Sequence, residues 1–289
     1  MLPLKDDNPT SRFPIVTVAL IVICVGVFIW QLNFPTNSRL DEAGFGQIDQ
    51  SSLEYGAIPY RITHPSTGDC AIGAVAEVQG QFEAGVVCPG TKDYAEARAR
   101  SEQNPGSDLG PFSIDEAPWW VTLFTSMFMH GGILHIAGNM LFLWVFGNNI
   151  EDRLGGLRFV LFYLLAGLIA VYTQAVIDTN STAPTIGASG AIAGVLGAYA
   201  LLYPRARVLT LIFIIFFVTL VEIPALILLA LWFILQFIPA LGQVAVESGG
   251  EQGVAYFAHV GGFVFGLAVA GLLLFWSRGR EPEPRLPIY

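Results

Sequence analysis

The sequence predicts an all-α, polytopic membrane protein: a bundle of six transmembrane helices with a long extracytoplasmic first loop. Hydrophobic residues make up 54% of its 289 residues and charged residues only 13%, whereas a soluble domain carries about 25% charged residues. The mean hydropathy is +0.59. The net charge of −9, without a basic stripe, argues against nucleic acid as a partner. Three cysteines are too few for a disulfide scaffold.

Five apolar stretches are long enough to cross a bilayer, which takes about 20 mostly apolar residues. They cover residues 14–32, 132–150, 159–177, 186–203 and 255–276. The first of these could instead be a signal peptide, but its apolar run is long for one and no small-residue cleavage site follows. We therefore interpret all five as spans.

A further span lies within residues 208–241. Pro224 suits the first turn of a helix, because its missing N–H costs nothing there. We therefore expect span five to run from near Glu222 to Leu241. Residues 208–220 are too short to cross and are expected at the membrane interface, so the total is six spans.

Lysine and arginine predict the orientation of the spans, because short cytoplasmic loops carry an excess of them. With the N-terminus inside, nine of the fourteen fall in cytoplasmic segments, namely Lys5, Arg12, Arg153, Arg158, Arg205, Arg207, Arg278, Arg280 and Arg285. The short outer loops, residues 178–185 and 242–254, carry none. The sequence therefore predicts a protein of the cell membrane, with residues 1–13 and 277–289 in the cytoplasm and residues 33–131 outside.

The long outer loop, residues 33–131, carries more than half of the acidic residues. Its aromatic end, residues 118–129, predicts a helix that lies in the outer interface, where tryptophan is favoured. Cys70 and Cys88 lie on the oxidising side of the membrane. That location is compatible with a disulfide between them and equally with two free thiols, because pairing cannot be read from a sequence.

Four polar side chains in the apolar spans are notable: His135 and Asn139 in span two, Ser189 in span four and His259 in span six. Polar groups inside a bilayer are costly and point to function. Even-numbered spans all run inward, so the four lie within roughly 6–12 Å of the outer helix ends at 1.5 Å per residue. Each of them alone is compatible with helix packing. Their common depth favours a single site.

Ser189 and His259 together have the chemistry of an activated nucleophile, in which the imidazole takes the hydroxyl proton during attack. Ladders of small residues follow both of them and would let the two helices approach closely. These ladders are Gly190, Gly194 and Gly197 after the serine, and Gly262, Gly266 and Ala270 after the histidine. No carboxylate is placed to orient the histidine within the membrane, which predicts a Ser–His dyad rather than a triad.

Three strings on spans two, four and six resemble the motifs of the rhomboid intramembrane serine proteases. They are His135-xxx-Asn139, Gly187-Ala-Ser189-Gly190 and Ala258-His259-Val-Gly-Gly262. The resemblance covers about residues 117–276 and the first span. It implies a six-span rhomboid-like bundle whose catalytic core is residues 132–276. It also implies an endopeptidase of the lipid bilayer that cleaves single-span membrane proteins in or near the outer part of the span, without a metal or cofactor.

The resemblance also implies a role for each residue of the motifs. Ser189 would be the nucleophile and His259 the general base. The oxyanion hole would consist of His135, Asn139 and the backbone N–H of Ser189. Gly187 and Gly190 would lie in the substrate-binding site. The substrate, the cleavage preference and the oligomeric state cannot be read from the sequence.

One departure leaves open how the base is held. Some relatives carry a tyrosine four residues after the serine, stacked on the histidine, where this chain has Ala193. The alternatives to a protease are a catalytically inactive rhomboid-like protein that binds membrane clients and a transporter. A transporter usually shows paired acids or interrupted helices at mid-depth. A metalloprotease is disfavoured, because no His-Glu-x-x-His string occurs.

Overall fold

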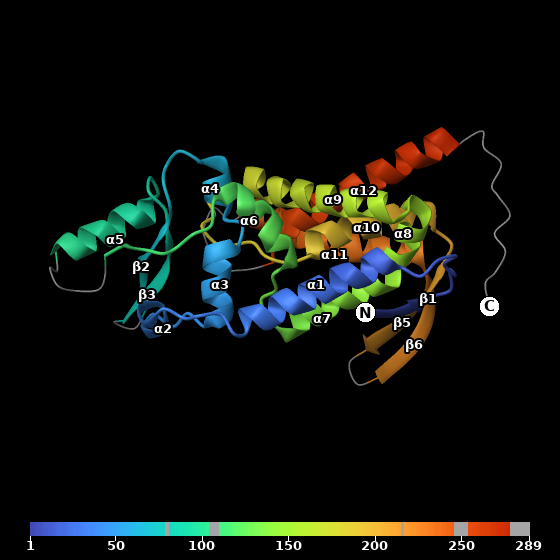
Figure 1. Ribbon diagram of the computed structural model, residues 1–289, viewed down its shortest axis with the longest axis horizontal. Coiled ribbons are helices and arrows are strands. Elements are labelled where there is room, and N and C mark those ends of the chain that lie inside the picture. Colours follow the sequence, from blue (N-terminus) through green and yellow to red (C-terminus); the bar gives the residue numbers. More distant parts are fainter. Residues whose placement is uncertain (79–80, 104–109, 215–216, 246–253, 278–289) are drawn as a thin grey trace.

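The computed structural model describes residues 1–78, 81–103, 110–214, 217–245 and 254–277. Its body is a bundle of apolar helices. A small domain of short helices and strands lies at one end of the bundle, and a three-stranded sheet lies at the other (Figure 1). The fold is therefore mostly helical, but it is not all-α as predicted.

Among the residues that the structure describes, four helical segments are long and apolar enough to cross a membrane. The first is continuous from α7 (Ile133–Phe142) through the π-helical turn η2 (Leu143–Gly147) to α8 (Asn148–Leu154). The others are α9 (Gly156–Ile177), α11 (Ala225–Ala245) and α12 (Tyr256–Ser277). They confirm long apolar helices at spans two, three, five and six. The predicted spans one and four correspond to the shorter apolar helices α1 (Ile15–Gln31) and α10 (Ser189–Leu202).

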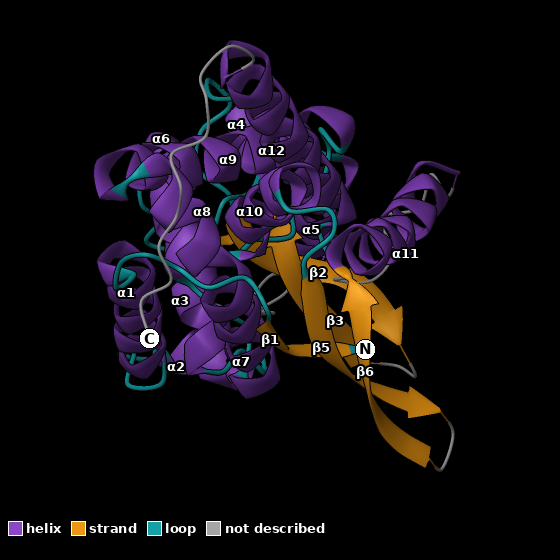
Figure 2. Ribbon diagram, turned by 90° about the vertical axis from the view of Figure 1, so that its right-hand side faces the viewer, coloured by secondary structure: helices purple, strands orange, loops and turns teal. Residues whose placement is uncertain are grey.

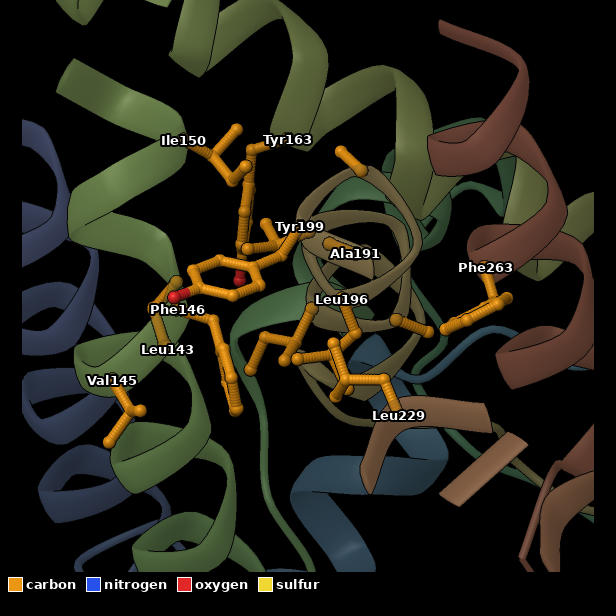
Figure 3. Packing of buried hydrophobic residues seen from close by; sticks show 14 of the residues in the cluster. Leu143, Val145, Phe146, Ile150, Tyr163, Ala191, Leu196, Tyr199, Leu229 and Phe263 are labelled. Atoms are coloured by element: carbon orange, nitrogen blue, oxygen red, sulfur yellow. The ribbon is translucent and has the colours of Figure 1, made fainter. Parts of the chain in front are cut away.

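Helix α10 lies in the centre of the bundle and is almost entirely buried. Its 14 residues extend about 21 Å at 1.5 Å per residue, which is less than the roughly 30 Å of the hydrocarbon core. Figure 3 shows Ala191, Leu196 and Tyr199 of α10 packed among side chains from the surrounding helices, such as Phe146 and Phe263. The neighbouring helices therefore enclose most of α10.

Glycines let α10 and α12 pack backbone against backbone. A Cβ atom at Gly262 of α12 would overlap the carbonyl oxygen of Gly190, and one at Gly266 would overlap that of Gly194. Gly197 of α10 faces the carbonyl of Phe263 in the same way. The predicted close approach of these two helices is therefore present, and it places their first turns together.

The start of helix α1 is attached to the middle of α8. Glu151 accepts hydrogen bonds from the backbone N–H groups of Val16 and Thr17 at 2.9 and 2.7 Å. These are donors that the first turn of a helix leaves without a helical partner. Thr17, Leu20, Cys24 and Phe28 of α1 are buried. Helix α1 is thus packed into the bundle.

The sheet is the part of the fold that departs from the all-α expectation. Strands β5 (Arg207–Ile214) and β6 (Phe217–Pro224) pair antiparallel as a hairpin. Strand β1 (Leu2–Asp6) completes the sheet in the order β1-β5-β6 (Figure 2). The hairpin is rich in Val, Ile, Thr and Phe, which favour strands. Hydropathy alone cannot distinguish such a strand from a short helix, and α11 begins directly after the hairpin.

The long loop folds into a domain of its own, which we call the appendage (residues 38–113). Its elements are α2 (Ser38–Glu42), α3 (Gln47–Tyr55), α4 (Pro59–Thr63), β2 (Ala71–Val78), β3 (Gln81–Val87), α5 (Lys92–Gln103) and β4 (Phe112–Ser113). A separate apolar cluster forms its core, with Leu53, Ile58 and Ile72 among its buried members. Helix α6 (Trp119–Thr125), at the predicted interfacial position, leads from the appendage to the bundle.

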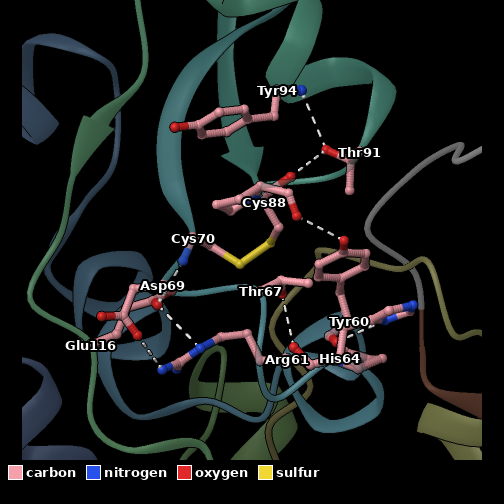
Figure 4. Close-up of a disulfide and its surroundings, with 12 residues drawn as sticks. Tyr60, Arg61, His64, Thr67, Asp69, Cys70, Cys88, Thr91, Tyr94 and Glu116 are labelled. Carbon is pink, nitrogen blue, oxygen red and sulfur yellow. Dashed lines mark hydrogen bonds and ion pairs between the residues drawn. A yellow bond between two sulfur atoms is a disulfide. The ribbon is translucent and has the colours of Figure 1, made fainter.

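A disulfide joins Cys70 and Cys88 within the core of the appendage (Figure 4). Around it, Arg61 forms ion pairs with Glu116 at 3.2 Å and with Asp69 at 3.0 Å. The bond closes a loop with a sequence separation of 18 residues. A loop of this size stabilises a fold by about 3 kcal/mol, chiefly by constraining the unfolded chain.

We therefore expect Cys70→Ser to destabilise the appendage by about 3 kcal/mol. Thiol labelling of the denatured protein, read by mass spectrometry, should modify Cys24 alone before reduction and all three cysteines after it. Labelling of Cys70 and Cys88 before reduction would contradict the disulfide.

Candidate active site

Ser189 is the first residue of α10 and follows a turn that requires glycine. Gly187 has φ +128°, a conformation that side-chain-bearing residues rarely adopt. Its N–H donates to the carbonyl of Ser126 at 2.8 Å. Two residues earlier, Thr185 exchanges backbone hydrogen bonds with Ala57 of the appendage, at 2.8 and 3.1 Å. The segment before the serine is therefore held by the appendage and by the chain that leads into α7.

His259 lies in the first turn of α12 and meets the serine directly. Its Nε2 atom is 2.7 Å from Ser189 Oγ, a hydrogen-bond distance between residues 70 positions apart in the sequence. The histidine is buried, with 8% of its surface exposed, and the serine is half-buried. Part of the serine residue is thus exposed, while the histidine is shielded by the helices around it.

Two residues of α11 hold the imidazole from its other side, and the sequence analysis did not identify either. Gln236 Oε1 is 2.7 Å from His259 Nδ1. The ring centroid of Trp232 is 6.0 Å from that of His259, with the ring planes at 41°. A carboxylate is the usual third member of such a site, and here an amide takes that place. A signal was nevertheless present, because Gln236 is a lone amide in an otherwise apolar stretch, which is costly in a membrane unless it is paired.

His135 lies beside the turn that carries the serine. The backbone N–H of Gly131 donates to its Nδ1 atom at 3.2 Å, which makes Nε2 the protonated nitrogen of the neutral ring. A Cβ atom at Gly187 would lie 2.9 Å from that Nε2 and 3.5 Å from Ser189 Oγ. The ring N–H of His135 therefore borders the space beside Gly187, and the hydroxyl of Ser189 borders the same space.

Asn139 is on the same face of α7, one turn further along, and is buried with 8% of its surface exposed. Its Nδ2 atom donates to the carbonyl of His135 at 3.0 Å. An amide nitrogen has two N–H groups, and this bond uses one of them. Gly190, unlike Gly187, packs against another helix, because a Cβ atom there would be 2.5 Å from that of Ala170. It packs α10 against α9.

The structure thus gathers a hydroxyl, an imidazole and polar N–H groups at the N-terminal ends of three helices. A hydroxyl whose oxygen lies 2.7 Å from an imidazole nitrogen can lose its proton to that nitrogen as it attacks an electrophile. Ser189 also begins a helix, where unpaired backbone N–H groups and the helix dipole favour negative charge. The arrangement is suited to acyl transfer.

Comparison with known proteins identifies the family. The rhomboid domain model matches residues 117–276. The mitochondrial presenilin-associated rhomboid-like protein of Bos taurus is 32% identical over 173 residues, covering 55% of this chain and 40% of that protein. The mitochondrial rhomboid protein 1 of Saccharomyces cerevisiae is 34% identical over 97 residues, covering 32% and 28%. The rhomboid protease GluP of Bacillus subtilis is 44% identical over 85 residues, covering 29% and 16%.

Each match spans less than half the length of the relative concerned. The family model, by contrast, covers more than half of this chain. It includes α7 to α12, the helices that carry all the polar residues described above. The chain is a multi-pass membrane protein that belongs to the rhomboid family.

Proposed function

We propose that the protein is an intramembrane serine endopeptidase, which hydrolyses peptide bonds in or near the transmembrane segments of membrane proteins. The observation that carries the proposal is the 2.7 Å distance between Ser189 Oγ and His259 Nε2. These residues lie on two helices, α10 and α12, whose backbones are in contact. The serine is half-buried. One of the matched relatives is named a rhomboid protease, which supports the same chemistry.

In the proposed reaction, Ser189 Oγ attacks the carbonyl carbon of the substrate while His259 Nε2 takes the hydroxyl proton. The tetrahedral intermediate carries a negative oxygen, which preset N–H donors stabilise. His135 Nε2, Asn139 Nδ2 and the backbone N–H of Ser189 are the donors in this proposal. His259 then gives its proton to the leaving amine, and water releases the acyl group by the same steps in reverse.

The proposal includes a membrane topology of six spans, with α1 and α10 as the two shorter ones. Both termini would be cytoplasmic and the site would open on the extracytoplasmic side of the cell membrane, on the same side as the appendage. The distribution of lysine and arginine supports this orientation. A site that opens near one face allows water to reach the acyl-enzyme, and single-span membrane proteins are the proposed substrates.

Purified protein in lipid vesicles, incubated with a panel of single-span membrane proteins, tests the function. We expect at least one substrate to be cut once, in or near its span, with the fragments identified by mass spectrometry. A His259→Ala variant should leave all of them intact. Binding of these proteins without cleavage would instead favour an inactive, client-binding relative. Ion or solute flux without cleavage would favour a transporter.

Asn139→Ala should lower kcat by about 10²–10³-fold with little change in KM, because an oxyanion donor acts mainly in the transition state. Asn33→Ala is a matched control, since its amide also donates to the carbonyl four residues earlier, at 2.8 Å, but at an exposed position. The control should keep wild-type kinetics. Unchanged kcat in Asn139→Ala would remove this residue from the oxyanion hole.

A further inference from the structure

We propose that Gln236 is the positioning residue of the general base: it fixes the tautomer and orientation of His259 so that Nε2 can accept the proton of Ser189. The inference rests on the proposed function, since it assigns His259 the role of base. It adds a third polar member to a site that the sequence presents as a dyad. It also makes α11 part of the catalytic machinery.

The two hydrogen bonds of His259 are complementary. A carbonyl oxygen of an amide only accepts, so Gln236 Oε1, 2.7 Å from Nδ1, requires the proton on Nδ1. The neutral ring then has a free lone pair on Nε2. That lone pair faces Ser189 Oγ at 2.7 Å, which is the arrangement that a general base needs. The opposite tautomer would place an N–H against the hydroxyl and block proton transfer.

The inward face of α11 is built to present this amide. Leu229, Trp232, Phe233, Gln236 and Ala240 recur every three or four residues, so they share one side of the helix. Leu229 and Ala240 are fully buried. Phe233 stacks on Phe263 of α12, with ring centroids 4.7 Å apart. Packing on both sides of Gln236 therefore sets the register of α11 against the helix that carries the base.

Trp232 supplies the second contact, one turn before the glutamine. Its ring lies against His259 and also against Phe263, with centroids 6.0 Å apart. In this chain the position four residues after the serine is Ala193, which is fully buried and has no ring to stack on the imidazole. The support of the imidazole therefore comes from α11, which holds it by an aromatic face and by a hydrogen bond.

The alternative is a purely structural role, in which Gln236 only joins two helices by a hydrogen bond, as amides in membrane proteins often do. In that case its loss would weaken packing without changing which nitrogen of His259 is protonated. The tautomer of His259 therefore separates the two roles. Nitrogen NMR of imidazole-labelled protein reports this tautomer directly and needs no substrate.

The decisive variants are Gln236→Met, which has similar length but accepts no comparable hydrogen bond, and Gln236→Glu, which can accept the bond again. For Gln236→Met we expect a mixture of tautomers and a kcat about 10–100-fold lower, the size of the loss when partners that orient metal-binding histidines are removed, with KM nearly unchanged. Gln236→Glu should restore the Nδ1–H tautomer and most of kcat. Leu235→Met, at a 52% exposed neighbour, is the control and should match the wild type.

Wild-type tautomer and kcat in Gln236→Met would overturn the proposal, as would a wild-type His259 protonated on Nε2. A lower kcat with an unchanged tautomer would reduce Gln236 to a packing residue. If the wild type cleaves nothing but the tautomer still depends on Gln236, the proposed protease function fails, while the positioning of His259 by Gln236 stands.

Discussion

Ser189→Ala should lower kcat/KM for a single-span reporter on the order of 10⁶-fold, as removal of a serine nucleophile does in other serine proteases. The change deletes one oxygen atom, whose hydrogen-bond partner is His259 Nε2. The residue begins a helix whose next eleven residues are all buried, and it is itself only half-buried, so the packing of α10 should not change. Initial rates of reporter cleavage in lipid vesicles measure the loss of activity, and the thermal unfolding temperature measures whether the packing is unchanged.

Ser113→Ala is the matched control for this prediction, because Ser113 is an exposed serine in β4 of the appendage. It should keep the wild-type rate. Wild-type cleavage by Ser189→Ala would exclude Ser189 as the nucleophile. A large fall in the unfolding temperature of Ser189→Ala would show that the serine supports the fold instead.

Gly262→Ala should move α10 and α12 apart. A Cβ atom at this position would overlap the carbonyl oxygen of Gly190 and lie 3.3 Å from the Cβ of Ala193. Neither backbone can move without displacing a helix, and such overpacking costs about 1–3 kcal/mol. Because His259 lies one turn earlier on α12, the shift should also move the base from the serine. A misplacement of about 1 Å can cost 10²-fold in rate.

Gly271→Ala is the control for this variant, since it introduces the same methyl group into the same helix. The nearest atom to its Cβ would be Leu201 Cδ2 at 3.8 Å, an ordinary contact. Alanine is a better helix former than glycine by up to about 1 kcal/mol, so this variant should be at least as stable as the wild type and equally active. An equal loss in both variants, by thermal unfolding and cleavage rate, would contradict the close-packing explanation.

The long apolar helices are readable from the sequence because hydrocarbon imposes a minimum length and excludes charge over that length. This constraint locates α9 and α12 to within a few residues. It fails for β5 and β6, since a strand of Val, Ile and Phe is as apolar as a helix. It fails also for the appendage, whose core joins short elements through distant contacts such as the disulfide of Cys70 with Cys88.

For the candidate site too, one part can be predicted from the sequence and another depends on the packing of the helices. A shared depth for His135, Ser189 and His259 follows from their positions in the spans, because helix rise converts sequence number into height. Which side chains meet at that depth depends on how each helix is rotated and packed. That rotation brings Gln236 of α11 to the far side of the imidazole.

Gly190 is an example of what a motif leaves open. Its motif suggests a place at the substrate, and the structure shows in addition that it packs against Ala170. Hydropathy and helix rise act along one chain, so composition and spacing are enough to identify the membrane class and the long apolar helices, and to predict a common height for the polar groups. Contacts between helices depend on the interlocking of several side-chain surfaces at once. The hydrogen-bonded chain from Gln236 through His259 to Ser189 therefore becomes visible only when three helices are packed together.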